Sequence, residues 1–129
     1  MIIIYTDGGS RGNPGRAASA FVAVENEQII KEDSKFIGNN KTNNEAEYEA
    51  IIFALESINE KELEIISDSE LVIKQITGKY KINKPHLALL NQKVQGLISK
   101  RNVVFKNVRR ENKFVAEADR LVNLKLDKN

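Results

Sequence analysis

The sequence contains no cysteine, no tryptophan and a single histidine, His86. Without cysteine the chain has no disulfide, no thiolate nucleophile and no zinc site built from cysteines. With one histidine it cannot build a multi-histidine metal site. Any bound metal ion must therefore be held by oxygen ligands.

Long apolar runs are also missing. The uninterrupted apolar runs, such as residues 2–5, are short, whereas a bilayer span needs roughly 20 residues, and no segment has the basic-then-apolar order of a signal peptide. The 129 residues, 41% hydrophobic and 29% charged, have the size and composition of one ordinary folded domain. We expect a soluble, cytoplasmic protein with a single domain over residues 1–129.

Positive charge is concentrated in one part of the chain. Residues 71–113 contain eleven basic residues against one acid, Glu111, for a net charge of +10, while the remaining residues carry nine basic and seventeen acidic groups, a net charge of −8. Solvated helix faces often carry charge runs, but a stretch this long with one acid favours a surface for a polyanion such as nucleic acid.

Apolar periodicity and turn residues predict the order βββαβααβα. The first three strands follow one another closely and should be antiparallel, whereas the fourth follows a helix and should lie parallel to the first. Residues 7–15, DGGSRGNPG, are predicted to turn sharply or to pass close to another part of the protein. The expected strands are 1–6, 16–24, 28–37, 63–67 and 103–108, and the expected helices are 42–59, 69–77, 86–100 and 114–126.

Asp7 and Asp68 each follow an apolar strand directly. Aspartate in this place often only starts a turn or caps the next helix. Two of them at the ends of neighbouring parallel strands would lie side by side, at the sheet edge where open α/β sheets bind ligands.

Glu47 carries a charge on the apolar side of its predicted helix. At about 100° per residue, Glu45, Glu49 and Glu56 cluster on one face, and Glu47 lies opposite them among apolar residues. Burying an ionised acid without a partner is costly, so this placement favours a cation or metal beside it. The alternative is that Glu47 is tolerated near the helix start by solvent and the helix dipole.

Asp119 lies at the edge of an apolar stripe in the last predicted helix, where a first-turn aspartate stabilised by the helix dipole is the simpler explanation from periodicity alone. Four converging carboxylates would nevertheless suit hard divalent cations such as Mg²⁺. Two such ions about 3.5–4 Å apart can activate a water and stabilise the leaving oxygen in phosphodiester hydrolysis.

Four segments occur in a specific order: YTDGGSRGNPG, TNNEAEYEAI, SDSELV, and RREN followed by ADRLVN. In this order and spacing they resemble the type 1 ribonucleases H over nearly the whole chain. The resemblance implies a ribonuclease H-like α/β fold, with a five-stranded mixed sheet and helices on both faces. It also implies endonucleolytic hydrolysis of the RNA strand of RNA/DNA hybrids to leave 5′-phosphate ends. The implied metal ligands are Asp7, Glu47, Asp68 and Asp119, holding two Mg²⁺ or Mn²⁺ ions when substrate is bound.

The resemblance further implies where the hybrid is held. Side-chain amides and a closely approaching backbone can read the wide minor groove of an RNA-containing duplex, and Asn13 and Thr42 would hold a DNA-strand phosphate. The predicted partner is an RNA/DNA hybrid, with double-stranded RNA left open as a second substrate, and the protein is expected to act as a monomer without a membrane. The predicted substrate-binding set is Gly8, Gly9, Ser10, Asn13, Thr42, Asn43, Asn44, Glu70, Lys79, Lys81, Lys84, Arg109 and Arg110.

The chain departs from the better-known bacterial pattern. No histidine precedes Asp119, the family often has glutamine where this chain has Glu70, and the additional residues KFV leave Glu117 as an alternative fourth ligand. The extended basic handle is also absent, so strand binding should depend on lysines of the short segment GKYKINKPH. Two other functions remain open: a module that binds hybrid or double-stranded RNA without cutting it, and another phosphate-ester hydrolase on the same sheet.

Overall fold

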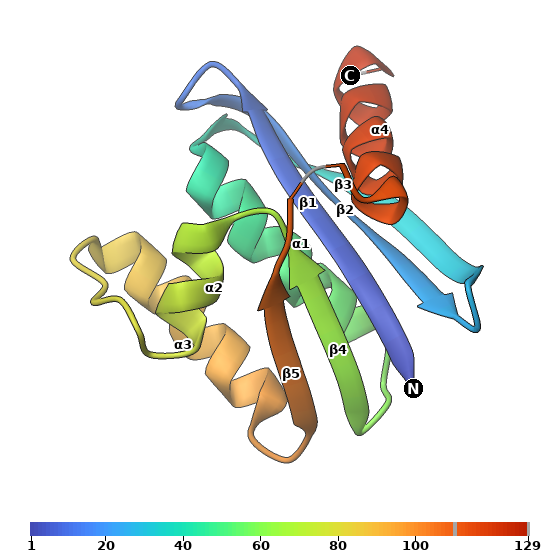
Figure 1. Cartoon of the computed structure of the whole chain (residues 1–129). Coiled ribbons are helices and arrows are strands. Elements are labelled where there is room, and N and C mark those ends of the chain that lie inside the picture. Colours follow the sequence, from blue (N-terminus) through green and yellow to red (C-terminus); the bar gives the residue numbers. More distant parts are fainter. Residues whose placement is uncertain (110, 129) are drawn as a thin grey trace.

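The computed structural model describes residues 1–109 and 111–128. Its elements are β1 (Ile2–Arg11), β2 (Gly15–Glu25), β3 (Gln28–Lys41), α1 (Asn43–Ser57), β4 (Glu62–Ser67), α2 (Glu70–Ile76), α3 (Pro85–Ile98), β5 (Asn102–Asn107) and α4 (Lys113–Lys128) (Figure 1). The strand order is β3-β2-β1-β4-β5, with β1 to β3 antiparallel and β4 and β5 parallel to β1. The predicted order and mixed sheet are confirmed. Within the described ranges, no helix is both long and apolar enough to cross a membrane.

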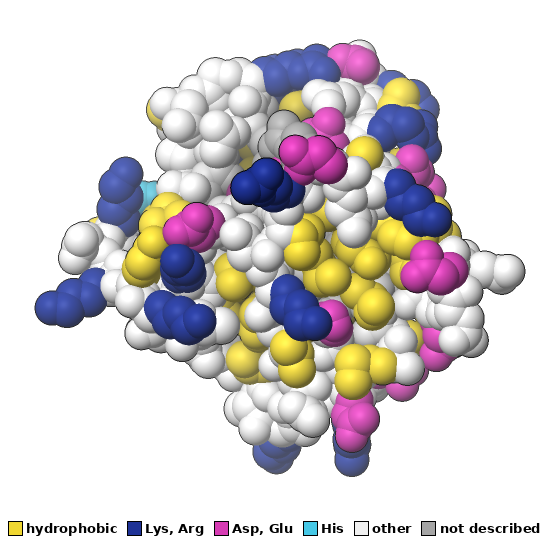
Figure 2. Space-filling model, viewed as in Figure 1, with side chains coloured by type: hydrophobic (Ala, Val, Ile, Leu, Met, Phe, Trp, Pro, Cys, Tyr) yellow, Lys and Arg dark blue, Asp and Glu magenta, His cyan; other side chains and the backbone are white. Residues whose placement is uncertain are grey.

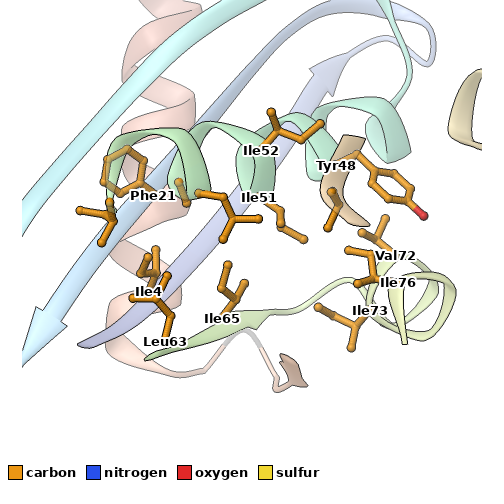
Figure 3. Close-up of a cluster of buried hydrophobic side chains, with 14 of the residues drawn as sticks. Ile4, Phe21, Tyr48, Ile51, Ile52, Leu63, Ile65, Val72, Ile73 and Ile76 are labelled. Carbon is orange, nitrogen blue, oxygen red and sulfur yellow. The ribbon is translucent and has the colours of Figure 1, made fainter. Parts of the chain in front are cut away.

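Helices cover both faces of the sheet. α1, α2 and α3 lie on one face, and α4 lies on the other (Figure 1). Consecutive residues of β1 face opposite layers: Ile4 packs with Phe21 and Ile51 under α1 (Figure 3), whereas Tyr5 packs against Phe114 of α4 with tilted rings whose centroids are 5.1 Å apart. This double cover is the physical reason that the strand is apolar at successive positions.

The prediction that residues 7–15 turn sharply or pass close to another part of the protein is confirmed, with the close approach at Gly8 and the turn at Gly12, but the predicted end of the first strand at residue 6 is wrong. β1 continues to Arg11, and the chain turns only at Gly12, where φ is +98°. A Cβ on Gly8 would lie 2.2 Å from the backbone carbonyl of Ala46 in α1. Glycine at this position therefore allows α1 to pack closely on the strand, and the chain turns later, at Gly12.

Side chains hold both ends of α1. At its start the hydroxyl of Thr42 accepts a hydrogen bond from the Glu45 N–H (3.1 Å), and the Glu45 carboxylate accepts one from the Thr42 N–H (2.9 Å). At its end the Arg101 guanidinium donates to the carbonyls of Leu55 (3.0 Å) and Glu60 (2.8 Å). These bonds satisfy backbone groups at the start of the helix and at or just beyond its end.

The additional residues before Asp119 form the first turn of α4. Asn112 precedes the helix, and its Oδ1 accepts hydrogen bonds from the backbone N–H groups of Phe114 (2.9 Å) and Val115 (3.2 Å). This is the geometry of a helix N-cap. The extra residues therefore lengthen α4 at its start.

Candidate metal centre

Asp7 and Asp68 lie side by side at one edge of the sheet. β1 and β4 are parallel neighbours with Thr6 opposite Ser67. Asp7 follows Thr6 and Asp68 follows Ser67, so the two aspartates are neighbours. Asp7 is 1% exposed and Asp68 is half-buried. The predicted juxtaposition is confirmed, and its cause is the parallel register.

Glu47 enters the same space from α1. Its side chain is 9% exposed, and the Gly8 N–H donates a hydrogen bond to Glu47 Oε1 over 2.9 Å. One carboxylate oxygen from each of Asp7, Glu47 and Asp68 lies within 4.8 Å of the others. The prediction that Glu47 points at the sheet is confirmed. Carboxylates this close repel one another, and an all-oxygen donor set of this kind fits a hard divalent cation such as Mg²⁺ or Mn²⁺.

Asp119 is on the wall of the same cleft but outside this group of three. The cleft has a volume of about 380 Å³ and is formed by β1, α1 and α4. Asp119 is half-buried, and its Oδ2 accepts a hydrogen bond from Asn123 Nδ2 over 3.4 Å. The residues that line the cleft are Asp7, Gly8, Gly9, Ser10, Arg11, Asn43, Glu47, Asp119, Val122, Asn123 and Leu126.

Glu117, the alternative fourth ligand, faces β3. Arg120 forms a two-bond pair with its carboxylate, at 2.8 Å and 2.7 Å, and Glu32 of β3 shares a hydrogen bond with it. The Arg120 pair lowers the pKa of Glu117, while burial and the neighbouring Glu117 raise the pKa of Glu32. The carboxylate of Glu117 thus already has a cation partner, and α4 presents Asp119 to the cleft.

Predicted substrate residues at the start of α1 bind one another. Asn13 Oδ1 accepts a hydrogen bond from the Asn43 N–H (2.9 Å), and Asn43 Oδ1 accepts one from the Ser10 N–H (2.8 Å). Ser10 Oγ donates to the carbonyl of Lys41 over 2.8 Å. These bonds attach the end of β1 to the start of α1. They keep the backbone of Gly8 to Ser10 at the cleft wall.

Asn44 lies in a second groove, of about 210 Å³, between α1, α2 and the α2–α3 loop. Lys81 and Lys84 line the same groove. A residue predicted to read the minor groove and two predicted phosphate contacts therefore share one surface.

Glu70 is exposed at the start of α2. Its Oε1 accepts hydrogen bonds from Lys74 Nζ and from the Tyr80 hydroxyl, both at 3.0 Å. The bonds from Lys74 and Tyr80 lower the pKa of Glu70. The ionised Glu70 carboxylate can only accept hydrogen bonds.

The basic segment of residues 71–113 is divided among several surfaces. Four of its lysines pair with acids from outside the segment, in the pairs Lys74–Glu70, Lys93–Glu56, Lys106–Glu64 and Lys113–Glu27, and Arg101 is occupied at the end of α1. Lys79, Lys81 and Lys84 are exposed in the α2–α3 loop, with no acid partner within residues 1–109 and 111–128. Arg109 is exposed after β5, and Arg110 lies outside the described residues. Basic side chains project around the α2–α3 region at the left of Figure 2.

Two polar residues of the cleft were not predicted. Asn123 follows Asp119 by four residues, and this helical spacing is the signal that could have identified it. Arg11 reaches α4 from the end of β1, and no local pattern predicts that contact.

The fold and the carboxylate group agree with the comparison to known families. The family model for RNase H matches residues 1–126. The chain therefore belongs to the ribonuclease H family.

Two similar solved structures are named as RNase H1. RNase H1 from the archaeon Halobacterium salinarum is 36% identical with a TM-score of 0.92, and the match covers 99% of this chain and 98% of that one. LC11-RNase H1, solved in complex with an RNA/DNA hybrid, is 41% identical with a TM-score of 0.90 and the same coverage, 99% and 98%. The chain is thus similar to compact type 1 ribonucleases H.

Curated relatives are longer than this chain. Ribonuclease HI of Halobacterium salinarum is 46% identical over 87 residues, which are 64% of this chain and 43% of that protein. The bifunctional protein Rv2228c of Mycobacterium tuberculosis is 35% identical over 132 residues, 98% of this chain and 35% of that protein. The chain therefore spans between a third and a half of the length of these relatives.

Proposed function

We propose that this protein is a ribonuclease H, an endonuclease that hydrolyses the RNA strand of RNA/DNA hybrids. The observation that carries the proposal is the group of Asp7, Glu47 and Asp68, whose ligand oxygens lie within 4.8 Å of one another at the carboxyl edge of the sheet. Family membership and a similar enzyme solved with a hybrid support the substrate class.

In this proposal the ligands are Asp7, Glu47, Asp68 and Asp119, and they hold two Mg²⁺ or Mn²⁺ ions when substrate is bound. Bound ions of this kind activate a water and stabilise the leaving oxygen of the phosphodiester. The protein's own contribution is to hold negative charge in fixed positions. The strand register holds the two aspartates, and the Gly8 N–H holds the Glu47 carboxylate.

The substrate would lie across the cleft and the groove beside it. The backbone of Gly8 to Ser10 at the cleft wall allows close approach to a shallow minor groove that displays 2′-hydroxyls. Amides from α1 would contact that groove, and the free lysines of the α2–α3 loop would neutralise phosphates. The other substrate contacts in the proposal are Asn13, Thr42, Asn43, Asn44, Glu70, Arg109 and Arg110. We extend the proposal to a monomer that acts in the cytoplasm and leaves 5′-phosphate ends.

The decisive experiment is a cleavage assay on labelled RNA/DNA hybrid, double-stranded RNA and double-stranded DNA, each with Mg²⁺, Mn²⁺ or EDTA. We expect metal-dependent cleavage of the RNA strand of the hybrid and none in EDTA. Hybrid that is bound but left intact with both metals would contradict the proposal and identify a binding module. Cleavage of double-stranded RNA at a comparable rate would widen the substrate class.

A further inference from the structure

Glu47 and Asp119 are held by different kinds of group. Glu47 accepts a hydrogen bond from the backbone of Gly8, which the sheet fixes. Across residues 1–109 and 111–128, the one donor to the Asp119 carboxylate is the side-chain amide of Asn123, with Nδ2 at 3.4 Å from Oδ2. The same Nδ2 also donates to the backbone carbonyl of Asp119 over 3.1 Å, so the amide is held against the helical turn that carries the Asp119 carboxylate.

Arg11 contacts Asn123 from the end of β1. Its Nη2 lies 3.3 Å from the backbone carbonyl oxygen of Asn123 and 3.5 Å from Asn123 Oδ1. The same nitrogen forms an ion pair with Asp127 at 2.6 Å. Arg11 and Asn123 both line the cleft that contains Asp119. A chain of polar contacts thus runs from β1 through α4 to the fourth carboxylate.

The oxygen of the Asn123 side-chain amide faces a hydrogen-bond donor, and its nitrogen faces an acceptor. A guanidinium only donates hydrogen bonds, and an ionised carboxylate only accepts them. Oδ1 must therefore face Arg11 while Nδ2 faces Asp119, because the reversed amide would place donor against donor and acceptor against acceptor. In this arrangement one hydrogen bond orients the Asp119 carboxylate through Oδ2, and its oxygens keep lone pairs for a metal ion.

We propose that Asn123 is a positioning residue for Asp119 and that Arg11 holds Asn123 in place. The inference rests on the proposed function, since it concerns how the fourth ligand of that metal site is oriented. Asn123 acts through Asp119 and contacts no reacting atom. Residues that orient metal-binding side chains typically change metal affinity or activity by about 10- to 100-fold when they are removed.

The test measures Mn²⁺ binding to the full chain by calorimetry, and hybrid cleavage as a function of Mg²⁺ concentration. Asn123→Ala should weaken Mn²⁺ binding and raise the Mg²⁺ concentration for half-maximal cleavage by about tenfold, with little change in the KM for hybrid. Asn123→Gln, which keeps an amide donor, should recover most of the loss. Leu124→Ala, at an exposed neighbouring position of α4, is the matched control and should leave Mn²⁺ binding unchanged.

Arg11→Ala should shift metal dependence in the same direction by a smaller factor. The double variant Arg11→Ala/Asn123→Ala should bind Mn²⁺ no more weakly than Asn123→Ala alone, because Arg11 acts only through Asn123. Additive losses would contradict the role given to Arg11.

Unchanged Mn²⁺ affinity and Mg²⁺ requirement in Asn123→Ala would overturn the inference. A lower melting temperature without altered metal dependence would also overturn it, because Asn123 would then be only structural. Asp119→Asn separates this result from the proposed function. If Asp119→Asn loses cleavage and Asn123→Ala does not, only the positioning role fails. If the wild-type protein neither binds Mn²⁺ nor cleaves hybrid, the proposed function fails with it.

Discussion

The backbone N–H of Gly8 lies 2.9 Å from Oε1 of Glu47 and donates a hydrogen bond to it. At the same point a Cβ on Gly8 would come within 2.2 Å of the Ala46 carbonyl and within 2.6 Å of the Glu47 nitrogen. β1 and α1 therefore meet backbone against backbone where the acidic group is built. The absence of a side chain on Gly8 thus allows both the close packing of α1 on β1 and the hydrogen bond that positions Glu47.

Gly8→Ala should push α1 away from β1, lower the free energy of unfolding by about 3 kcal/mol and reduce cleavage by displacing Glu47. Gly9→Ala is the control for stability, because its Cβ would meet only Val122 Cγ1 at 3.4 Å. Its free energy of unfolding should stay within about 1 kcal/mol of wild type. Urea unfolding measures both variants, and equal stabilities would contradict the proposed tight approach.

Asp7→Asn should abolish cleavage while leaving hybrid binding largely intact, because the proposed central ligand loses its charge and keeps its shape. In metal-free buffer its melting temperature should rise, since one of three mutually repelling carboxylates is neutralised. Cleavage and binding assays with thermal unfolding in EDTA measure these effects. Glu47→Gln and Asp68→Asn should behave alike. Activity within about tenfold of wild type would contradict the metal-site assignment.

Asp119→Asn and Glu117→Gln should differ strongly. Asp119→Asn should be severely impaired, most visibly with Mg²⁺, whose strict octahedral geometry tolerates a missing ligand poorly. Glu117→Gln should keep its activity, because its carboxylate pairs with Arg120 on the side of α4 that faces β3. Cleavage rates of both variants with Mg²⁺ and with Mn²⁺ show whether Asp119 or Glu117 is the fourth ligand. The reverse result would assign the fourth ligand to Glu117.

The free lysines of the α2–α3 loop should contribute to substrate binding. The triple variant Lys79→Ala/Lys81→Ala/Lys84→Ala should raise KM more than it lowers kcat. It should also flatten the dependence of log K on log salt by about one unit per lost phosphate contact. Binding titrations over a range of salt concentrations measure this slope.

The matched control removes the same charge elsewhere. Lys93→Ala/Lys106→Ala/Lys113→Ala replaces three lysines that already pair with acids in the structure. Its salt slope should stay close to wild type. Equal slopes in the two triple variants would mean that net charge, and not the loop, determines hybrid binding.

Tyr48 should make stability sensitive to alkaline pH. Its hydroxyl is buried and donates to Gln75 Oε1 over 2.8 Å, and burial raises the pKa of the Tyr48 phenol. The unfolded chain therefore loses this proton first as pH rises past about 10, so the folded state should lose stability there. Tyr48→Phe should remove part of this alkaline loss.

At neutral pH the same substitution should cost about 1–3 kcal/mol, because Gln75 Oε1 loses its buried donor. Urea unfolding from pH 8 to pH 10.5 or so measures both effects. An identical alkaline slope in wild type and Tyr48→Phe would contradict the role of the buried phenol.

The sequence by itself determined the element order, the strand directions and three members of the acidic group. Apolar periodicity separates strands from helices, and a helix between two strands favours a parallel crossover, which here brings Asp7 and Asp68 together. Helical phase alone placed Glu47 toward the sheet, as the structure has it. Element order, strand direction and helical phase depend on local geometry, so the spacing of residue types along the sequence predicts them.

The tertiary structure decided what depends on contacts between distant segments. β1 extends to Arg11 although its last residues are glycine-rich and polar, because pairing with β2 and packing under α1 stabilise it. Four of the eleven basic residues in an apparently uniform segment pair with acids, Lys74 within α2 and the other three with acids of α1, β4 and the β2–β3 turn, which leaves the α2–α3 loop positive. The contact of Arg11 with Asn123 joins residues 112 positions apart. No local propensity encodes such a contact, because it forms only once the sheet and α4 have packed together.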